Sequence, residues 1–201
     1  MGERRPLQSR DARWAKATAS FLAARRVPPN LISIGSVVFA AIAGAAFVGS
    51  TFAFRIPLLI LGAISIQLRL ICNLLDGMVA VEGKLGSKSG EIYNDLPDRI
   101  ADPLILVCAG YATAWPFLGW CAGLLAVMTA YVRLLGAATG AGQDFRGPMA
   151  KPQRMAVMTL ASLVQIVTPY AFPAALALIV LGCVVTIARR TANIKRILES
   201  R

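Results

Sequence analysis

The sequence predicts an all-α integral membrane protein with six transmembrane helices and an N-terminal interfacial amphipathic helix. Of its 201 residues, 57% are hydrophobic and only 15% are charged, whereas a soluble domain is about half apolar and about a quarter charged. Several charge-free runs reach the roughly 20 residues that a membrane-spanning helix needs. The basic residues, which give a net charge of +11, gather mainly between these runs. This composition excludes a disordered chain and disfavours a soluble enzyme.

The first two predicted spans are single apolar runs. Residues 31–54 carry no charge and form the first span. Residues 56–75 form the second, which only Gln67 and Arg69 interrupt. Both runs are close to the length needed to cross the hydrocarbon core of a bilayer.

The remaining four spans lie in two longer runs. Residues 103–132 and 155–188 carry no charge, and each run is too long for one membrane helix. Pro116 lies near the middle of the former, and residues 168–173, which include two prolines, lie near the middle of the latter. Because proline removes a helical hydrogen bond, we expect each run to break there into two helices.

The basic residues predict which side of the membrane each connection faces. Residues 1–26 contain seven Lys or Arg residues, and further basic clusters lie between spans two and three, between spans four and five, and after span six. On the opposite side of the predicted topology, only Arg55 is charged. Cytoplasmic segments of membrane proteins are enriched in Lys and Arg. The sequence therefore predicts a multi-pass protein with both termini in the cytoplasm.

Residues 1–26 form a predicted juxtamembrane segment, and residues 27–201 form the six-helix membrane domain. The residues that share one face of a helix in the first segment are Trp14, Ala17, Thr18 and Phe21. Basic residues cover much of the remaining surface, which is typical of a helix lying on an anionic membrane surface. A solvated basic tail is the alternative. A cleavable signal is not expected, because the first apolar run is long enough to span the membrane.

The absence of histidine excludes several classes of site. Zinc sites with His ligands, His general bases and Ser-His-Asp triads all require it. Each of the four cysteines lies within an apolar stretch and none forms a Cys-x-x-Cys pair, so we expect small buried hydrophobic residues. They are Cys72, Cys108, Cys121 and Cys183.

Six of the ten acidic residues lie within residues 76–102, at the predicted cytoplasmic end of span two and the start of span three. Two sets of positions share a helical face: Asn73, Asp76, Gly77 and Ala80 in one helix, and Asn94 and Asp98 in the next. Oxygen ligands without His or Cys suit a hard cation such as Mg²⁺. The small Gly77 and Ala80 would let a ligand approach the backbone. The alternative is an ordinary acidic loop paired with Lys84, Lys88 and Arg99.

This segment resembles the signature of the CDP-alcohol phosphotransferase (CDP-alcohol phosphatidyltransferase) family, D-x-x-D-G-x-x-A-R-x8-G-x-x-x-D-x-x-x-D. The positions that match at the right separations are Asp76, Gly77, Ala80, Gly90 and Asp98. The six spans, the cytoplasmic termini and the sequence Pro-Asn-Leu-Ile at residues 29–32 are also similar to the family. Three positions depart from the signature: Asn73 and Asn94 replace aspartates, and Val81 replaces the arginine.

The resemblance implies a phospholipid-synthesis enzyme that transfers a phosphatidyl group from a CDP-linked donor to an alcohol and releases CMP. The short six-span chain favours CDP-diacylglycerol as the donor. The implied ligands of Mg²⁺ or Mn²⁺ are Asp76, Asp98, Asn73 and Asn94, with Asp95 as a further candidate. The implied nucleotide contacts are Gly77, Ala80 and Gly90. Asp98 would be the catalytic base, at the cytoplasmic face of a homodimer that contacts membrane lipids and no nucleic acid.

Basic residues near the motif are candidates for contacts with phosphate groups or with a phosphorylated acceptor alcohol: Lys84, Lys88, Arg133, Lys151 and Arg154. Either of the first two would stand in for the missing arginine. Cytoplasmic anchoring explains the same charges without a ligand. Arg69, inside span two, is expected to meet a carboxylate, Asp76 or Asp102, or to extend toward the interface.

The three departures from the signature also motivate a second hypothesis, a non-catalytic relative that binds CDP-lipid or a partner protein. A small transporter is disfavoured, because transporters place polar residues near the bilayer midplane on broken helices. Here the polar cluster is predicted at the membrane surface. Release of CMP from CDP-diacylglycerol would separate the enzyme from the non-catalytic relative.

Overall fold

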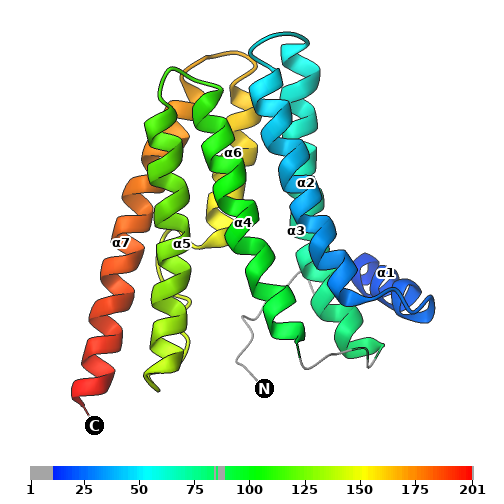
Figure 1. Ribbon diagram of the computed structural model, residues 1–201, viewed down its shortest axis with the longest axis vertical. Coiled ribbons are helices and arrows are strands. Elements are labelled where there is room, and N and C mark those ends of the chain that lie inside the picture. The colour runs from blue at the N-terminus through cyan, green and yellow to red at the C-terminus, as the bar shows by residue number, and fades with distance from the viewer. Residues whose placement is uncertain (1–10, 84, 86–88, 201) are drawn as a thin grey trace.

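The computed structural model describes residues 11–83, 85 and 89–200, and this part of the chain folds into seven helices without a strand. In chain order the helices are α1 (Arg13–Ala24), α2 (Pro29–Gly49), α3 (Arg55–Glu82), α4 (Gly90–Tyr111), α5 (Pro116–Ala138), α6 (Lys151–Val164) and α7 (Ala171–Glu199). Figure 1 shows α2 to α7 as an up-and-down bundle, with the α2–α3, α4–α5 and α6–α7 connections at one end. Helix α1 and the C-terminal end of α7 lie at the other end.

Helices α2 to α7 follow the six predicted spans in order. Helix α5 begins at Pro116 and α7 begins at Ala171, so both long apolar runs break near their prolines, as predicted. Helices α2, α3, α5 and α7 are long and apolar enough to cross a membrane. Helix α6 has 14 residues, and α4 carries charged residues in its first half. Four helices of the described chain thus meet the criteria for a membrane span, and the count of six stays a prediction.

Two helices extend past the predicted apolar spans and carry the acidic cluster. Helix α3 continues through the motif to Glu82, and its 28 residues correspond to about 42 Å at 1.5 Å per residue. That length exceeds the roughly 30 Å of a hydrocarbon core. Helix α4 begins at Gly90, well before residue 103. The signature therefore lies on the ends of two helices and on the connection between them.

Small residues let the helices of the bundle approach closely. A Cβ atom on Gly110 of α4 would lie 2.8 Å from the Cα of Gly119 in α5, so these two backbones meet directly. The Phe47 and Phe172 rings, 4.8 Å apart between centroids, join the last turn of α2 to the first turn of α7. Both phenylalanines are fully buried. Small residues and paired aromatic rings thus pack the helices closely where these contacts occur.

Helix α1 lies within the predicted juxtamembrane segment, and it packs on the bundle through residues outside the predicted apolar face. Ala15 and Ala19 are fully buried and belong to a small apolar cluster with residues of α3. Ser20 donates a hydrogen bond to Glu82 at the end of α3, with 2.9 Å between the oxygens. Trp14 and Phe21, on the predicted apolar face, are 49% and 57% exposed. The face with Trp14 and Phe21 is therefore turned away from the bundle. Its placement on a membrane surface stays a prediction.

Candidate active site

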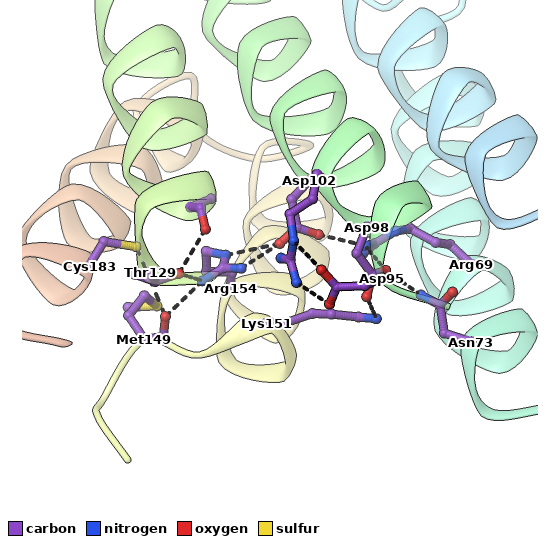
Figure 2. A network of polar contacts seen from close by, with 12 residues as sticks. Arg69, Asn73, Asp95, Asp98, Asp102, Thr129, Met149, Lys151, Arg154 and Cys183 are labelled. Carbon is purple, nitrogen blue, oxygen red and sulfur yellow. Dashed lines mark hydrogen bonds and ion pairs between the residues drawn. The ribbon is translucent and has the colours of Figure 1, made fainter. Parts of the chain in front are cut away.

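The polar side chains of three helices meet where the first turn of α6 faces the middle of α3 and α4 (Figure 2). The residues that build this cluster are Arg69 and Asn73 on α3, Asp95, Asp98 and Asp102 on α4, and Lys151 and Arg154 on α6. Spacings of three and four residues keep each set on one face of its helix. Interhelical packing then turns the three faces toward one another.

Asp102 is the buried centre of the cluster. Its Oδ1 accepts a hydrogen bond of 2.5 Å from Arg69 Nη2, and its Oδ2 accepts bonds of 2.5 Å and 3.1 Å from Arg154 Nη2 and Nε. The Asp102 and Arg154 side chains are each 2% exposed, and the Arg69 side chain is fully buried. The predicted contact between Arg69 and Asp102 is confirmed. Buried charges are tolerated when they are paired and hydrogen-bonded in this way.

Arg154 ties the α5–α6 connection to this centre. Its Nη1 donates to Thr129 Oγ1 at 3.1 Å and to the Met149 carbonyl oxygen at 2.9 Å. Sequence analysis named Arg154 as a candidate contact for an acceptor phosphate. In the structure its hydrogen bonds all go to neighbouring protein groups and it is 1% exposed. This arrangement gives Arg154 a structural role.

Asp98, the predicted catalytic base, lies beside this buried centre. Its Oδ1 accepts hydrogen bonds from Arg69 Nη2 at 3.0 Å and from Asn73 Nδ2 at 2.9 Å. Its Oδ2 is in direct contact with Lys151 Nζ. Asn73 and Lys151, two residues of the predicted site, are therefore brought to Asp98. Both oxygens of the carboxylate are engaged by N–H donors in this state.

Asp95 faces a different pair of cations. It accepts hydrogen bonds of 2.6 Å and 3.1 Å from Arg99, one turn further along α4, and one of 2.6 Å from Arg133 of α5. Its side chain is 31% exposed. The predicted candidates Asp95 and Arg133 are thus paired with each other. Whether Asp95 serves as a metal ligand stays a prediction.

Among the carboxylates of the motif, that of Asp76 has a buried oxygen that accepts no hydrogen bond from the described residues. Its Oδ2 accepts a hydrogen bond of 2.6 Å from Ser33 Oγ of α2, whereas its buried Oδ1 has no hydrogen-bond partner among the described residues. Sequence reasoning missed Ser33. The available signal was the pair of serines, Ser33 and Ser36, within an otherwise apolar run, since buried hydroxyls require a partner.

The predicted nucleotide contacts lie where α3 and α4 approach the connection between them. Gly77 and Ala80 are partly exposed on α3, and Gly90 is the first residue of α4. Asn94 and Val81 are exposed, and Val81 leaves 63% of its surface open. Lys84 and Lys88 lie outside the described residues. The predicted ligand Asn94 thus has an exposed position in the first turns of α4.

A second polar group holds the α5–α6 connection against α7. Asp144 accepts three hydrogen bonds of 2.9–3.1 Å from the backbone and side chain of Arg146, and one of 3.0 Å from Asn193. Burial raises the pKa of Asp144, but the hydrogen bonds and the charge of Arg146 lower it by a larger amount. The pKa therefore lies below its usual value of 3.8. These residues line an open pocket of about 370 Å³. Arg146 belongs to the basic cluster that the sequence places between spans four and five.

The residues fit one divalent cation better than two. Within the described part of the chain, no three acidic or cysteine side chains gather closely enough to hold a metal ion. The free Oδ1 of Asp76 is the donor that suits a hard cation. Asp98 already contacts two cationic side chains, Arg69 and Lys151, and positive neighbours oppose the binding of a metal ion. Asp76 is therefore the side chain around which a cation would bind.

No protein-family model and no curated protein sequence matches the chain. Solved structures do match it, and three of them are of the phosphatidylinositol phosphate synthase PgsA1 of Mycobacterium tuberculosis, each 19% identical to this chain. The structure with CDP-DAG bound aligns with a TM-score of 0.78 over 91% of this chain and 94% of the synthase. The complex with manganese and citrate has a TM-score of 0.76, over 90% and 88% of the two chains.

The apo form of the same synthase aligns with a TM-score of 0.73 over 89% of this chain and 94% of the synthase. The likeness therefore holds in all three structures and spans nearly the whole length of both proteins. At 19% identity it concerns the arrangement of helices. The chain has the fold of the phosphatidylinositol phosphate synthase PgsA1.

Proposed function

We propose that the protein is a membrane phosphatidyltransferase of the CDP-alcohol phosphotransferase type. It would transfer a phosphatidyl group from CDP-diacylglycerol to an alcohol and release CMP. The observation that carries this proposal is the contact between motif residues of α3 and α4, Asn73 and Asp98, in a fold shared with a synthase solved with CDP-DAG bound. The chemistry of the residues and the likeness of the fold thus point to the same reaction.

The membrane setting follows from the helices and charges. Helices α2, α3, α5 and α7 are long and apolar enough to cross a bilayer, and α4 and α6 would complete six spans. Large apolar side chains remain exposed on the bundle, among them Leu124 of α5 and Leu181 of α7, as expected for a lipid-facing surface. The basic connections favour cytoplasmic termini and a cytoplasmic site. A homodimer is proposed from the family resemblance alone.

The reaction requires an in-line attack and neutralisation of the diphosphate charge. The acceptor hydroxyl oxygen forms a bond to the phosphorus that carries the diacylglycerol, and the bond from that phosphorus to the departing CMP breaks. Asp98 accepts the hydroxyl proton as the general base. Arg69 and Asn73 hold the Asp98 carboxylate in position through its Oδ1.

A divalent cation, Mg²⁺ or Mn²⁺, held at Asp76 would neutralise charge on the diphosphate when bound. Asp76 itself is fixed by Ser33, which leaves the second carboxylate oxygen for the cation. The partly exposed Gly77 and Ala80 provide the low surface along which the nucleotide would lie. The acceptor alcohol would approach from the side of α6, where Lys151 is located.

The second candidate function is binding of CDP-lipid without turnover. The observation that favours it is the cationic contact on the general base, because Lys151 and Arg69 together occupy both oxygens of Asp98. Asn73 and Asn94, which stand in place of aspartates of the signature, also favour binding without turnover. A protein of this kind would bind the donor and leave it intact.

One experiment separates the two functions. Purified protein in mixed micelles is incubated with CDP-diacylglycerol, Mg²⁺ or Mn²⁺ and a panel of free and phosphorylated alcohols, and CMP is quantified. The transferase predicts CMP release that depends on one acceptor and on Asp98. Binding of CDP-diacylglycerol without CMP release, for every acceptor, would favour the non-catalytic function.

A further inference from the structure

Lys151 has an unusual place among the carboxylates of the site. It is the first residue of α6, and its Nζ contacts Asp98 Oδ2. The same ammonium group interacts electrostatically with Asp76 and with Asp102. The positive charge of Lys151 is therefore in contact with one carboxylate, that of Asp98, and acts electrostatically on two more.

The position of Lys151 in its helix supports a specific role for this charge. The N-terminus of a helix carries partial positive charge, which disfavours a cation in the first turn. The first turn of α6 nevertheless contains both Lys151 and Arg154, without an acidic residue. The carboxylates of α4 offset this unfavourable placement. The Lys151 side chain is thus stabilised by the carboxylates of the site and does not stabilise the N-terminus of α6.

Lys151 is also the accessible cation of the cluster. Its side chain is 26% exposed, whereas those of Arg69 and Arg154 are 0% and 2% exposed. Arg154 is committed to Asp102 and to the α5–α6 connection. A phosphate group that enters the site can therefore be reached by the flexible ammonium of Lys151, while the two arginines stay in place.

We propose that the Lys151 ammonium supplies, beside one divalent cation at Asp76, the positive charge that a second divalent cation would otherwise bring to the diphosphate. The loss of two signature carboxylates, at Asn73 and Asn94, removes negative charge that a second metal ion would need, and the lysine supplies a permanent positive charge instead. On donor binding Lys151 turns from Asp98 Oδ2 to the diphosphate. That movement also leaves Oδ2 of Asp98 open to accept a proton.

This proposal rests on the proposed function for its ligand, but its first test needs no CDP-lipid. Binding of Mn²⁺ to the purified protein is counted by electron paramagnetic resonance. The wild-type chain is expected to bind no more than one Mn²⁺, and Lys151→Met combined with Asn73→Asp and Asn94→Asp is expected to bind one more. Two Mn²⁺ ions per wild-type chain would overturn the replacement by Lys151 and leave the transferase function untouched.

The second test measures binding of CDP, a soluble probe of the donor head group, by calorimetry in excess EDTA. Loss of a charge-assisted hydrogen bond at Lys151 predicts an affinity about tenfold weaker or more for Lys151→Met. Lys151→Arg should retain most of the affinity, because it keeps the charge. Lys195→Met is the matched control, because Lys195 is 71% exposed and paired with Glu199 on the far end of α7.

The outcomes of the second test are also distinct. Equal CDP affinity for wild type and Lys151→Met in EDTA would overturn the proposal, provided that both proteins unfold at similar temperatures. If Lys151→Met does not fold, the Mn²⁺ count of wild type decides the question, because two bound ions per chain overturn the proposal and no more than one supports it. Absence of CDP binding by wild type, together with absence of CMP release, would instead refute the proposed function.

Discussion

Substitution of Asp102 by asparagine tests the buried ionic centre on which the site is built. Asp102→Asn keeps the size of the side chain but removes the charge that Arg69 and Arg154 share. Breaking a buried pair costs roughly 3–5 kcal/mol, because the partner charge stays buried. In this variant Arg69 still donates a hydrogen bond to Asp98, and Arg154 still donates to Thr129 and to the Met149 carbonyl oxygen. We therefore expect the lower end, about 3 kcal/mol of unfolding free energy.

That loss corresponds to a lower melting temperature by about 6–12 °C, since about 1 kcal/mol shifts a chain of this size by roughly 2–4 °C. Unfolding in detergent can be followed with a thiol-reactive dye, because all four cysteines are free and Cys183 is buried. Asp11→Asn is the matched control, because Asp11 is 83% exposed beside Lys16 and such pairs contribute little. An Asp102→Asn melting temperature no lower than that of Asp11→Asn would refute the reasoning.

Three further predictions follow from the site and the packing. Asp98→Asn should abolish CMP release while weakening CDP affinity much less, because a base acts in the transition state; equal losses would assign Asp98 to donor binding. The folded pKa of Asp144 lies below 3.8, so its charge stabilises the protein above its unfolded pKa of about 3.9 and this stabilisation is lost as the pH falls through the folded pKa. The melting-temperature difference between wild type and Asp144→Asn should accordingly be constant from about pH 7 to 5 and shrink below about pH 4; a difference that grows on acidification would be contrary. Gly110→Ala should lower the unfolding free energy by roughly 1–3 kcal/mol through backbone overpacking, whereas Gly35→Ala, which meets nothing within 4 Å, should be neutral or stabilising; equal effects in thermal unfolding would contradict this.

The sequence predicted the helices well because each one is encoded locally. The apolar runs and the prolines near residues 116 and 169 placed the breaks, because each run is too long for one span and proline removes a helical hydrogen bond. Proline alone does not mark a break, since α4 continues through Pro97 and Pro103. The spacing of Asn94 and Asp98 also predicted a helix that the apolar pattern missed, because α4 begins at Gly90 within a polar stretch. Length and hydropathy alone put that span later, at residue 103.

The contacts of the site were harder to predict because they join helices far apart in sequence. Lys151 and Arg154 lie 53 and 52 residues from their partners Asp98 and Asp102. No periodicity within one helix sets how two helices rotate against each other. Sequence analysis placed Lys151 and Arg154 together as candidate phosphate contacts, yet packing separates them into an accessible ammonium and a buried structural guanidinium.

The contact of α1 with the bundle was also not predicted. Sequence analysis described the face with Trp14 and Phe21 as lying on a membrane surface and left open which residues pack on the bundle. Ala15 and Ala19 make that contact, in a cluster with residues of α3. These partners lie far away in the sequence, and a single helical segment does not contain that information.

The most direct test of phosphatidyl transfer is release of CMP from CDP-diacylglycerol by the purified wild-type protein, compared with Asp98→Asn and Lys195→Met under the same conditions. Transfer predicts CMP and a new phospholipid in equal amounts for wild type and for Lys195→Met, and neither product for Asp98→Asn. Intact CDP-diacylglycerol with every acceptor, or product formation that is indifferent to Asp98, would contradict catalysis at this site.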